Sequence, residues 1–230
     1  MKTELIVALD ADKLEVAEKI VEAAGDNVKW YKVGKQLFTL YGPKTIEMLK
    51  NKGKKVFLDL KFHDIPNTVG GAIQSAGAIG ADMVNIHASG GSAMMKAAAD
   101  SAKSLNKDMI LIAVTVLTSI DDATMKTMGF SCSPGELALS LAKLAKANNI
   151  AGVVASAWEI KTIKEVCGKD FLLIVPGIRP AGSAKDDQKR VMTPRQASEA
   201  GADYIVVGRP VTQADNPAEA AKKILEELDI

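Results

Sequence analysis

The sequence predicts a single (β/α)8 barrel, a closed parallel sheet of eight strands surrounded by helices, over residues 1–230. Eight short runs of apolar and β-branched residues recur along the chain, and a segment with helical periodicity follows each of them. The starts of these runs are mostly 20 to 29 residues apart, the length of one strand and one helix. No linker or break in composition marks a second domain. An open, doubly wound sheet is the alternative fold.

The predicted strands are almost continuously apolar, as expected for strands buried on both faces of a parallel sheet. Two intervals between strand starts are longer than the rest, 43 residues after the fifth strand and 32 after the seventh. We interpret the extra residues as loops on the functional rim of the barrel. The strands are expected at residues 4–10, 28–34, 54–61, 83–88, 109–117, 152–156, 172–178 and 204–209.

The predicted helices show apolar residues on one stripe and charged residues opposite, most clearly over residues 13–24. Asp12 is expected to cap this first helix, and Gly25 to end it. The remaining helices are expected at residues 43–52, 66–80, 90–104, 134–149, 159–168, 194–200 and 217–228.

Two later helices carry proline in the first turn, where its missing N–H leaves no hydrogen bond unmade. Pro134 follows Ser133, and Pro194 follows Thr193. We therefore expect Ser133 and Thr193 to be the N-caps of these helices.

Composition excludes several classes of function. The 29 basic and 28 acidic residues leave a net charge of +1, and aromatic residues make up 4% of the chain, so neither nucleic acid nor an anionic membrane is an expected partner. Two cysteines, Cys132 and Cys167, do not make a disulfide framework or a four-ligand zinc site. The apolar segment near the start is too short for a signal peptide, and no run is long enough to span a membrane. We expect a soluble, cytoplasmic protein.

Polar residues gather where the predicted strands end, which in a (β/α)8 barrel is the rim that carries the active site. Taken alone, Asp10 is better explained as a helix cap, and Lys32 equally well as a solvated rim lysine. The rim residues are Asp10, Lys32, Asp59, Lys61, His87, Thr115, Thr118, Arg179, Gly208 and Arg209.

Asp59 and Lys61 are the strongest functional signal in the sequence. Residues two apart on a strand point to the same side, so a carboxylate and an ammonium share one face of a buried strand. Asp64 follows three residues later, and Pro66 is expected to begin the next helix with Thr68 in its first turn. A structural ion pair at the barrel mouth is the alternative interpretation.

A metal site is weighed and not predicted. His63 and His87 are the only histidines, and together with Asp59 and Asp64 they offer possible ligands. Lys61, however, lies among these carboxylates and competes with a cation for them.

The ends of the seventh and eighth strands favour a phosphate site. Barrels commonly bind phosphate there, with backbone N–H groups and arginines. The end of one strand supplies Gly177 and Arg179, the end of the other supplies Gly208 and Arg209, and the loop to residue 190 is long enough to close over a ligand. An exposed charged loop without a ligand is the alternative. The residues thus predict a phosphate-bearing small molecule held opposite an Asp/Lys cluster.

The segment DLKFHDIPNT, residues 59–68, resembles the signature of the orotidine 5′-phosphate decarboxylases. The resemblance extends over almost the whole chain, because ALDAD, YKVGKQLF, VTVLTS, VPGIRPAG, DQKRVMTP and YIVVGRP follow the bacterial pattern in order. It implies cofactor-free decarboxylation of orotidine 5′-monophosphate to UMP, a step of pyrimidine biosynthesis, on a barrel that forms a homodimer.

The resemblance also implies a role for each matching residue. Lys61 would donate a proton to C6 of the pyrimidine, within a charge network of Lys32, Asp59, Lys61 and Asp64. Asp64 and Thr68 would reach into the active site of the neighbouring subunit. The remaining contacts with the substrate would come from Asp10 at the ribose, Thr118 and Pro176 beside the base, and Arg179, Gln188, Gly208 and Arg209 at the phosphate.

Two rival functions remain open at this point. Decarboxylases of sugar phosphates, such as the 3-keto-gulonate-6-phosphate enzyme, also carry an Asp-x-Lys-x-x-Asp strand end but use magnesium. The IPNT, VLTS and GIRP segments of this chain suit a nucleotide better. A non-enzymatic sensor of phosphorylated ligands is the rival from another class, and the intact charge cluster argues against it.

Overall fold

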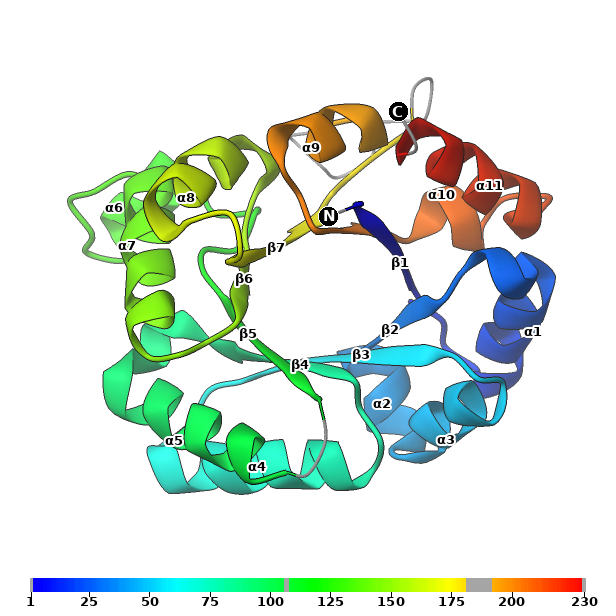
Figure 1. Ribbon diagram of the computed structural model, residues 1–230, viewed down its shortest axis with the longest axis horizontal. Coiled ribbons are helices and arrows are strands. Elements are labelled where there is room, and N and C mark those ends of the chain that lie inside the picture. Colours follow the sequence, from blue (N-terminus) through cyan, green and yellow to red (C-terminus); the bar gives the residue numbers. More distant parts are fainter. Residues whose placement is uncertain (1, 106–107, 181–191, 229–230) are drawn as a thin grey trace.

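The chain folds into a closed barrel of eight parallel strands, in which each strand is hydrogen-bonded to the next and β8 returns to β1 (Figure 1). The computed structural model describes residues 2–105, 108–180 and 192–228. The predicted fold is confirmed, and closure rules out the open sheet. The strands are β1 (Glu4–Ala8), β2 (Trp30–Gly34), β3 (Lys55–Phe62), β4 (Met83–His87), β5 (Ile110–Val114), β6 (Gly152–Val154), β7 (Leu172–Pro176) and β8 (Tyr204–Val207).

All eight predicted helices are present, and the described residues add three short α-helices that follow strand ends, α2, α6 and α10. The described residues also form three 3-10 turns: η1 (Gly25–Asn27), η2 (Ala88–Gly90) and η3 (Ala157–Glu159). The α-helices are α1 (Leu14–Ala24), α2 (Lys35–Tyr41), α3 (Lys44–Asn51), α4 (Pro66–Ala78), α5 (Gly91–Ser104), α6 (Asp122–Thr127), α7 (Pro134–Ala147), α8 (Ile160–Cys167), α9 (Pro194–Ala200), α10 (Arg209–Thr212) and α11 (Pro217–Leu228).

Helix capping follows the prediction at two of three N-termini. Ser133 and Thr193 each accept a hydrogen bond from the backbone N–H three residues later, in complete capping boxes. The assignment of Asp12 is wrong, because the N-cap of α1 is Lys13, whose backbone is extended and whose side chain makes no capping bond. Gly25 does end α1, with a φ of 62° that glycine adopts without strain.

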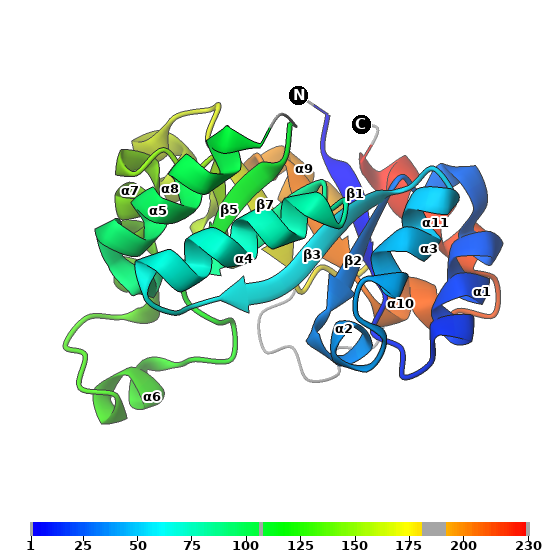
Figure 2. The same ribbon diagram turned by 90° about the horizontal axis from the view of Figure 1, so that it is seen from below.

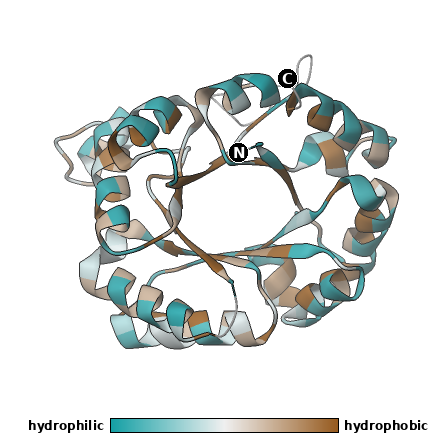
Figure 3. Cartoon of the chain, in the orientation of Figure 1, coloured by the Kyte–Doolittle hydropathy of each residue, from teal (hydrophilic) through white to brown (hydrophobic). Residues whose placement is uncertain are grey.

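Two layers of apolar side chains surround and fill the barrel. The larger lies between the strands and the helices, and Figure 3 shows the strands as mostly hydrophobic. The smaller fills the barrel interior, where Trp30 and Tyr204 meet edge to face with ring centroids 5.6 Å apart. Both rings lie at the N-terminal ends of their strands, so the interior is closed at that end.

The loop after β5 carries α6 away from the other helices (Figure 2). This is one of the two long segments that we assigned to the functional rim. Asp121 caps α6 by accepting a hydrogen bond from the Thr124 N–H. No helix in the described ranges is long and apolar enough to cross a bilayer.

Candidate active site

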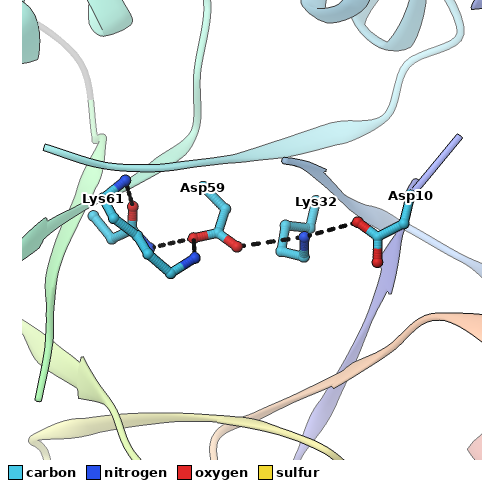
Figure 4. Close-up of polar contacts among 5 residues, drawn as sticks. Asp10, Lys32, Asp59 and Lys61 are labelled. Atoms are coloured by element: carbon cyan, nitrogen blue, oxygen red, sulfur yellow. Dashed lines mark hydrogen bonds and ion pairs between the residues drawn. The ribbon is translucent and has the colours of Figure 1, made fainter. Parts of the chain in front are cut away.

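A chain of alternating charges crosses the C-terminal ends of β1, β2 and β3 (Figure 4). The Lys32 ammonium lies 3.3 Å from a carboxylate oxygen of Asp10 and 3.3 Å from Oδ2 of Asp59. The Lys61 ammonium lies 2.5 Å from Oδ1 of Asp59. Asp59 is thus held between two ammonium groups, so four of the predicted site residues meet in one network.

The strand alternation that placed Asp59 and Lys61 on one face is confirmed by their surroundings. Phe57, two residues before Asp59, belongs to the apolar cluster inside the barrel. Leu58 and Leu60 pack instead against the helices outside it. The inward face of β3 therefore changes from an aromatic residue to an ion pair toward the functional rim.

The pairing of β3 with β4 is irregular at the ion pair. The ladder joins Leu58 to Val84 and resumes only at Phe62 and Ile86, so three residues of β3 face one residue of β4. Within this bulge Lys61 has a φ of 56°, a left-handed conformation that is unfavourable for residues with a Cβ atom. Bulges are often found beside active sites, where they redirect a side chain.

Asn85 is the β4 residue opposite the bulge, and our sequence analysis did not select it. Its side chain is fully buried, accepts a hydrogen bond from the Lys61 backbone N–H at 2.8 Å, and donates one to Asp59 Oδ1 at 2.6 Å. A signal was available in the sequence. Met83, Asn85 and His87 alternate on one face of an otherwise apolar strand, so a buried amide was predictable at this position.

The Asp59 carboxyl is 12% exposed and remains ionised. Burial is the largest single influence on its pKa and raises it. The positive charges of Lys32 and Lys61, with hydrogen bonds from Lys61 and Asn85, act in the opposite direction. Together they outweigh burial and hold the pKa of Asp59 below its ordinary value. The site therefore keeps a fixed negative charge between two positive ones.

Two glycines leave room for the charge chain. A Cβ atom on Gly34 would lie 3.2 Å from the Lys32 ammonium and 3.5 Å from Asp10. A Cβ atom on Gly208 would lie 3.5 Å from the other Asp10 oxygen. Asp10 itself is largely exposed, with a side-chain accessibility of 60%, so it has a free edge toward solvent.

A cavity of about 260 Å³ lies directly against this chain of charges. Its polar wall is formed by Lys32, Asp59 and Lys61, and Thr118 and Pro176 also line it. A larger hollow, of about 820 Å³, is lined by residues of α5 and the N-terminal side of β5, among them Asp100, Lys103 and Asp108, and by no residue of the charge chain. The smaller cavity is the better candidate site, because it combines charges with an apolar wall. That wall includes Val114, Val154, Ile174 and Val206.

The predicted phosphate-binding residues follow two adjacent strands. Arg179 lies beyond the end of β7 and is 6% exposed, and its Nη1 donates to the carbonyl of Ile178 at 3.1 Å. Arg209 begins α10 immediately after Gly208, and β7 and β8 are paired. Gln188 lies outside the described residues, as does most of the loop between Arg179 and residue 190.

Asp64 and Thr68 are exposed and do not line the cavity of their own chain. Asp64 accepts a hydrogen bond from the backbone N–H of Ile65 at 2.6 Å, at the start of α4. Among the described residues it makes no ion pair. Ile65 beside it is 66% exposed.

The two histidines stack near the site, with ring centroids 5.4 Å apart. Burial, followed by electrostatic interactions with His63, Lys61 and Lys35, lowers the pKa of His87. Within the described part of the chain, no group of three or more His, Cys, Asp or Glu side chains is arranged to hold a metal ion. The Lys61 ammonium lies against the Asp59 carboxylate, where it competes with a cation for that group.

The chain matches a protein family over nearly its whole length. The family described as "Orotidine 5'-phosphate decarboxylase / HUMPS family" matches residues 3–224. The orotidine 5′-phosphate decarboxylase of Pectobacterium atrosepticum is 50% identical over 216 residues, which make up 94% of this chain and 87% of that protein.

Solved structures agree with this match. The crystal structure of orotidine 5′-phosphate decarboxylase from Lactobacillus acidophilus superposes with a TM-score of 0.88 at 40% identity, covering 99% of this chain and 100% of that one. Orotidine 5′-monophosphate decarboxylase from Methanocaldococcus jannaschii, complexed with the inhibitor BMP, gives a TM-score of 0.81 at 29% identity, with both chains covered completely (100%).

Proposed function

This chain belongs to the orotidine 5′-phosphate decarboxylase / HUMPS family, and on that basis we propose that it converts orotidine 5′-monophosphate to UMP in pyrimidine biosynthesis. Its family membership makes it a carboxy-lyase. In the proposed reaction the bond between C6 and the carboxylate breaks, CO2 leaves, and a proton is added at C6. No metal or organic cofactor takes part in this proposal.

The observation that carries the proposal is the Lys61 ammonium at the wall of the cavity, held by Asp59. Loss of CO2 leaves the electron pair on C6 as a vinylic carbanion, without a neighbouring carbonyl to accept it. An ammonium group fixed beside that carbon stabilises the developing charge and then supplies the proton. Lys61 is thereby left neutral and regains a proton from solvent.

Asp59 has a second role in the proposed reaction. Its carboxylate is ionised and almost buried, so a substrate carboxylate bound beside it is repelled. Two such charges about 4 Å apart repel by about 4 kcal/mol at an effective dielectric constant near 20. Departure of CO2 removes one of the two charges, so the repulsion is relieved as the reaction proceeds.

The remaining contacts follow from where the rim residues lie. The apolar wall, with Thr118 and Pro176, suits the face of a pyrimidine ring, and the exposed Asp10 carboxylate suits the ribose hydroxyls. Arg179 and Arg209, with Gly208 and Gln188, would bind the 5′-phosphate at the ends of β7 and β8. Binding energy from this distant group would drive closure of the 179–190 loop and removal of water from the reacting carbon.

We also propose that the protein is a cytoplasmic homodimer with shared sites. Asp64 and Thr68 are exposed and do not line their own cavity, and the exposed Ile65 lies next to Asp64 in the chain. A second copy covering this surface would bury Ile65 and bring Asp64 to the neighbouring Lys61. In the described part of a single chain, the charge network joins residues on or just after β1, β2 and β3 only. Asp64 from the second copy would complete it.

The first experiment is the ultraviolet absorbance change of orotidine 5′-monophosphate with purified protein in excess EDTA. Conversion to UMP establishes the activity and its independence of a chelatable metal. Conversion that requires added magnesium, or activity only on sugar phosphates, supports the rival decarboxylase instead. Binding of UMP without turnover, with unchanged binding in Lys61→Ala, supports a sensor.

A further inference from the structure

We propose that Asn85 is a positioning residue for the reaction, whose side chain fixes both the backbone of Lys61 and the carboxylate of Asp59. This inference rests on the proposed function, because it assigns Asn85 a task in the same site. Asn85 does not line the cavity, so it acts through the two residues that do.

The two hydrogen bonds of Asn85 allow only one orientation of its amide. The Lys61 backbone N–H can only donate, so it requires the Asn85 oxygen, at 2.8 Å. The ionised Asp59 carboxylate can only accept, so it requires the Asn85 nitrogen, at 2.6 Å. Aspartate, leucine or alanine at this position cannot satisfy both partners at neutral pH. The site therefore depends on an amide, which offers a hydrogen-bond acceptor and a donor on the same side chain.

The bulge in β3 explains why a side chain is needed here. Between the pairs Leu58–Val84 and Phe62–Ile86 the strand ladder is interrupted, and the N–H of Lys61 is directed to the Asn85 side chain instead. The left-handed backbone of Lys61 is unfavourable and persists only where its surroundings hold it. Asn85 supplies that restraint at the residue whose ammonium must reach C6.

The same amide orients Asp59. Oδ1 of Asp59 accepts hydrogen bonds from both the Asn85 amide and the Lys61 ammonium, while Oδ2 of Asp59 faces Lys32. Three donors, one each on β2, β4 and its own strand β3, thus fix the plane of the carboxylate. Because Asn85 is 0% exposed, no solvent molecule is available to replace its bond to Asp59.

The test compares Asn85→Leu and Asn85→Asp with the wild type. We expect Asn85→Leu to lower kcat by about 100-fold, the effect of misplacing a reacting group by about 1 Å. The KM for orotidine 5′-monophosphate and the affinity for UMP should change less than about threefold, since the phosphate residues are untouched. Met83→Leu, a volume-conserving change at the previous inward position of β4, is the control and should leave kcat unchanged.

Asn85→Asp separates positioning from simple packing. The new carboxylate still accepts the hydrogen bond from the Lys61 backbone N–H, but it repels the carboxylate of Asp59. At low pH the two carboxylates can share one proton, which replaces the hydrogen bond that the Asn85 amide donates to Asp59. The ratio of its kcat to that of the wild type should therefore rise by about tenfold between pH 8 and pH 5. A loss of packing would not produce this change in the pH profile.

Amide hydrogen exchange at Lys61 tests the proposal without turnover. The Lys61 N–H should exchange about tenfold faster in Asn85→Leu, and should stay protected in Asn85→Asp, which keeps the acceptor. If the wild type does not turn over the substrate, the proposed function fails while this readout still decides the role of Asn85. Unchanged exchange in Asn85→Leu, a kcat within about threefold of the wild type, or a parallel loss of UMP affinity would each overturn the proposal.

Discussion

The Lys61 ammonium forms an ion pair with the carboxylate of Asp59, two residues earlier on β3, and the backbone of Lys61 is left-handed, with a φ of 56°. The strand bulges at this point, so the pair does not lie on a regular ladder. The conformation that presents the ammonium to the cavity is thus one that the chain would not adopt by itself. Strain of this kind is typically concentrated at functional sites.

Replacing Lys61 should therefore separate activity from stability. Lys61→Ala is expected to abolish turnover while the protein remains folded, because the side chain lies at the rim rather than in the apolar core. Lys61→Gly should be equally inactive but more stable than Lys61→Ala by about 0.5–1 kcal/mol. Relief of a left-handed conformation, about 1–2 kcal/mol, exceeds the entropic disadvantage of glycine.

Urea unfolding of the two variants measures this difference, and their common loss of the ammonium provides the internal control. Near-normal turnover in either variant would remove Lys61 as the proton donor. An alanine variant more stable than the glycine variant would show that the left-handed conformation is not retained.

Asp59 should make the stability of the protein sensitive to acid. Its pKa is lowered, because the two lysines and the two hydrogen bonds outweigh burial, so its stabilising contribution is present above the ordinary carboxyl pKa. That contribution is lost as the pH falls below about 4, through the lowered pKa. Between pH 6 and pH 3, Asp59→Asn should therefore lose less of its free energy of unfolding than the wild type does.

Denaturant unfolding at several pH values measures how steeply the free energy of unfolding changes with pH in each protein. Asp215→Asn, at an exposed position outside the site, controls for the removal of one carboxylate. The quantity compared is the change with pH and not the absolute stability, since Asp59→Asn also leaves two ammonium groups without their partner. Parallel slopes for wild type and Asp59→Asn would contradict the role assigned to its ionised form.

Arg209 should act chiefly through the phosphate. Arg209→Ala is expected to weaken binding of UMP by about 10- to 100-fold, the loss of one or two charge-assisted hydrogen bonds. Uridine, which lacks the phosphate, should respond much less. Calorimetric titration with both ligands checks this, with Arg195→Ala, an exposed arginine on α9, as the matched control. An equal loss for both ligands would place Arg209 at the nucleoside instead.

The sequence was sufficient for the barrel because continuous apolar runs identify strands that are buried on both faces. Alternation then placed Asp59 and Lys61 together, since most of β3 is extended. It did not predict the bulge or the left-handed Lys61, because residue counting assumes regular backbone throughout. Asn85 was missed for a related reason: its importance comes from an irregularity in the neighbouring strand.

The sequence pattern also failed to predict three short helices and the N-cap of α1. The helices α2, α6 and α10 have between 4 and 7 residues, which is little for a helical period to emerge. The helix α9 is also 7 residues long, but Thr193 and Pro194 marked its start. Asp12 has a good capping side chain, but α1 begins one residue later than its pattern indicated. The roles expected of Asp64 and Thr68 would require a second chain, so they remain predictions of the family resemblance.

A mixture of inactive subunits tests the shared site. If Asp64 serves the neighbouring subunit, a dimer of one Asp64→Ala and one Lys61→Ala chain has one complete site, formed by Lys61 of the first and Asp64 of the second. Random exchange gives such mixed dimers in about half of the population, and half of their sites are complete, so about one quarter of wild-type activity should return. Lys61→Ala mixed with Asp59→Ala is the control, because both residues lie in the same chain's site and neither mixed site is complete. Native mass spectrometry verifies exchange, and mixed dimers without recovered activity would show that each chain relies on its own Asp64.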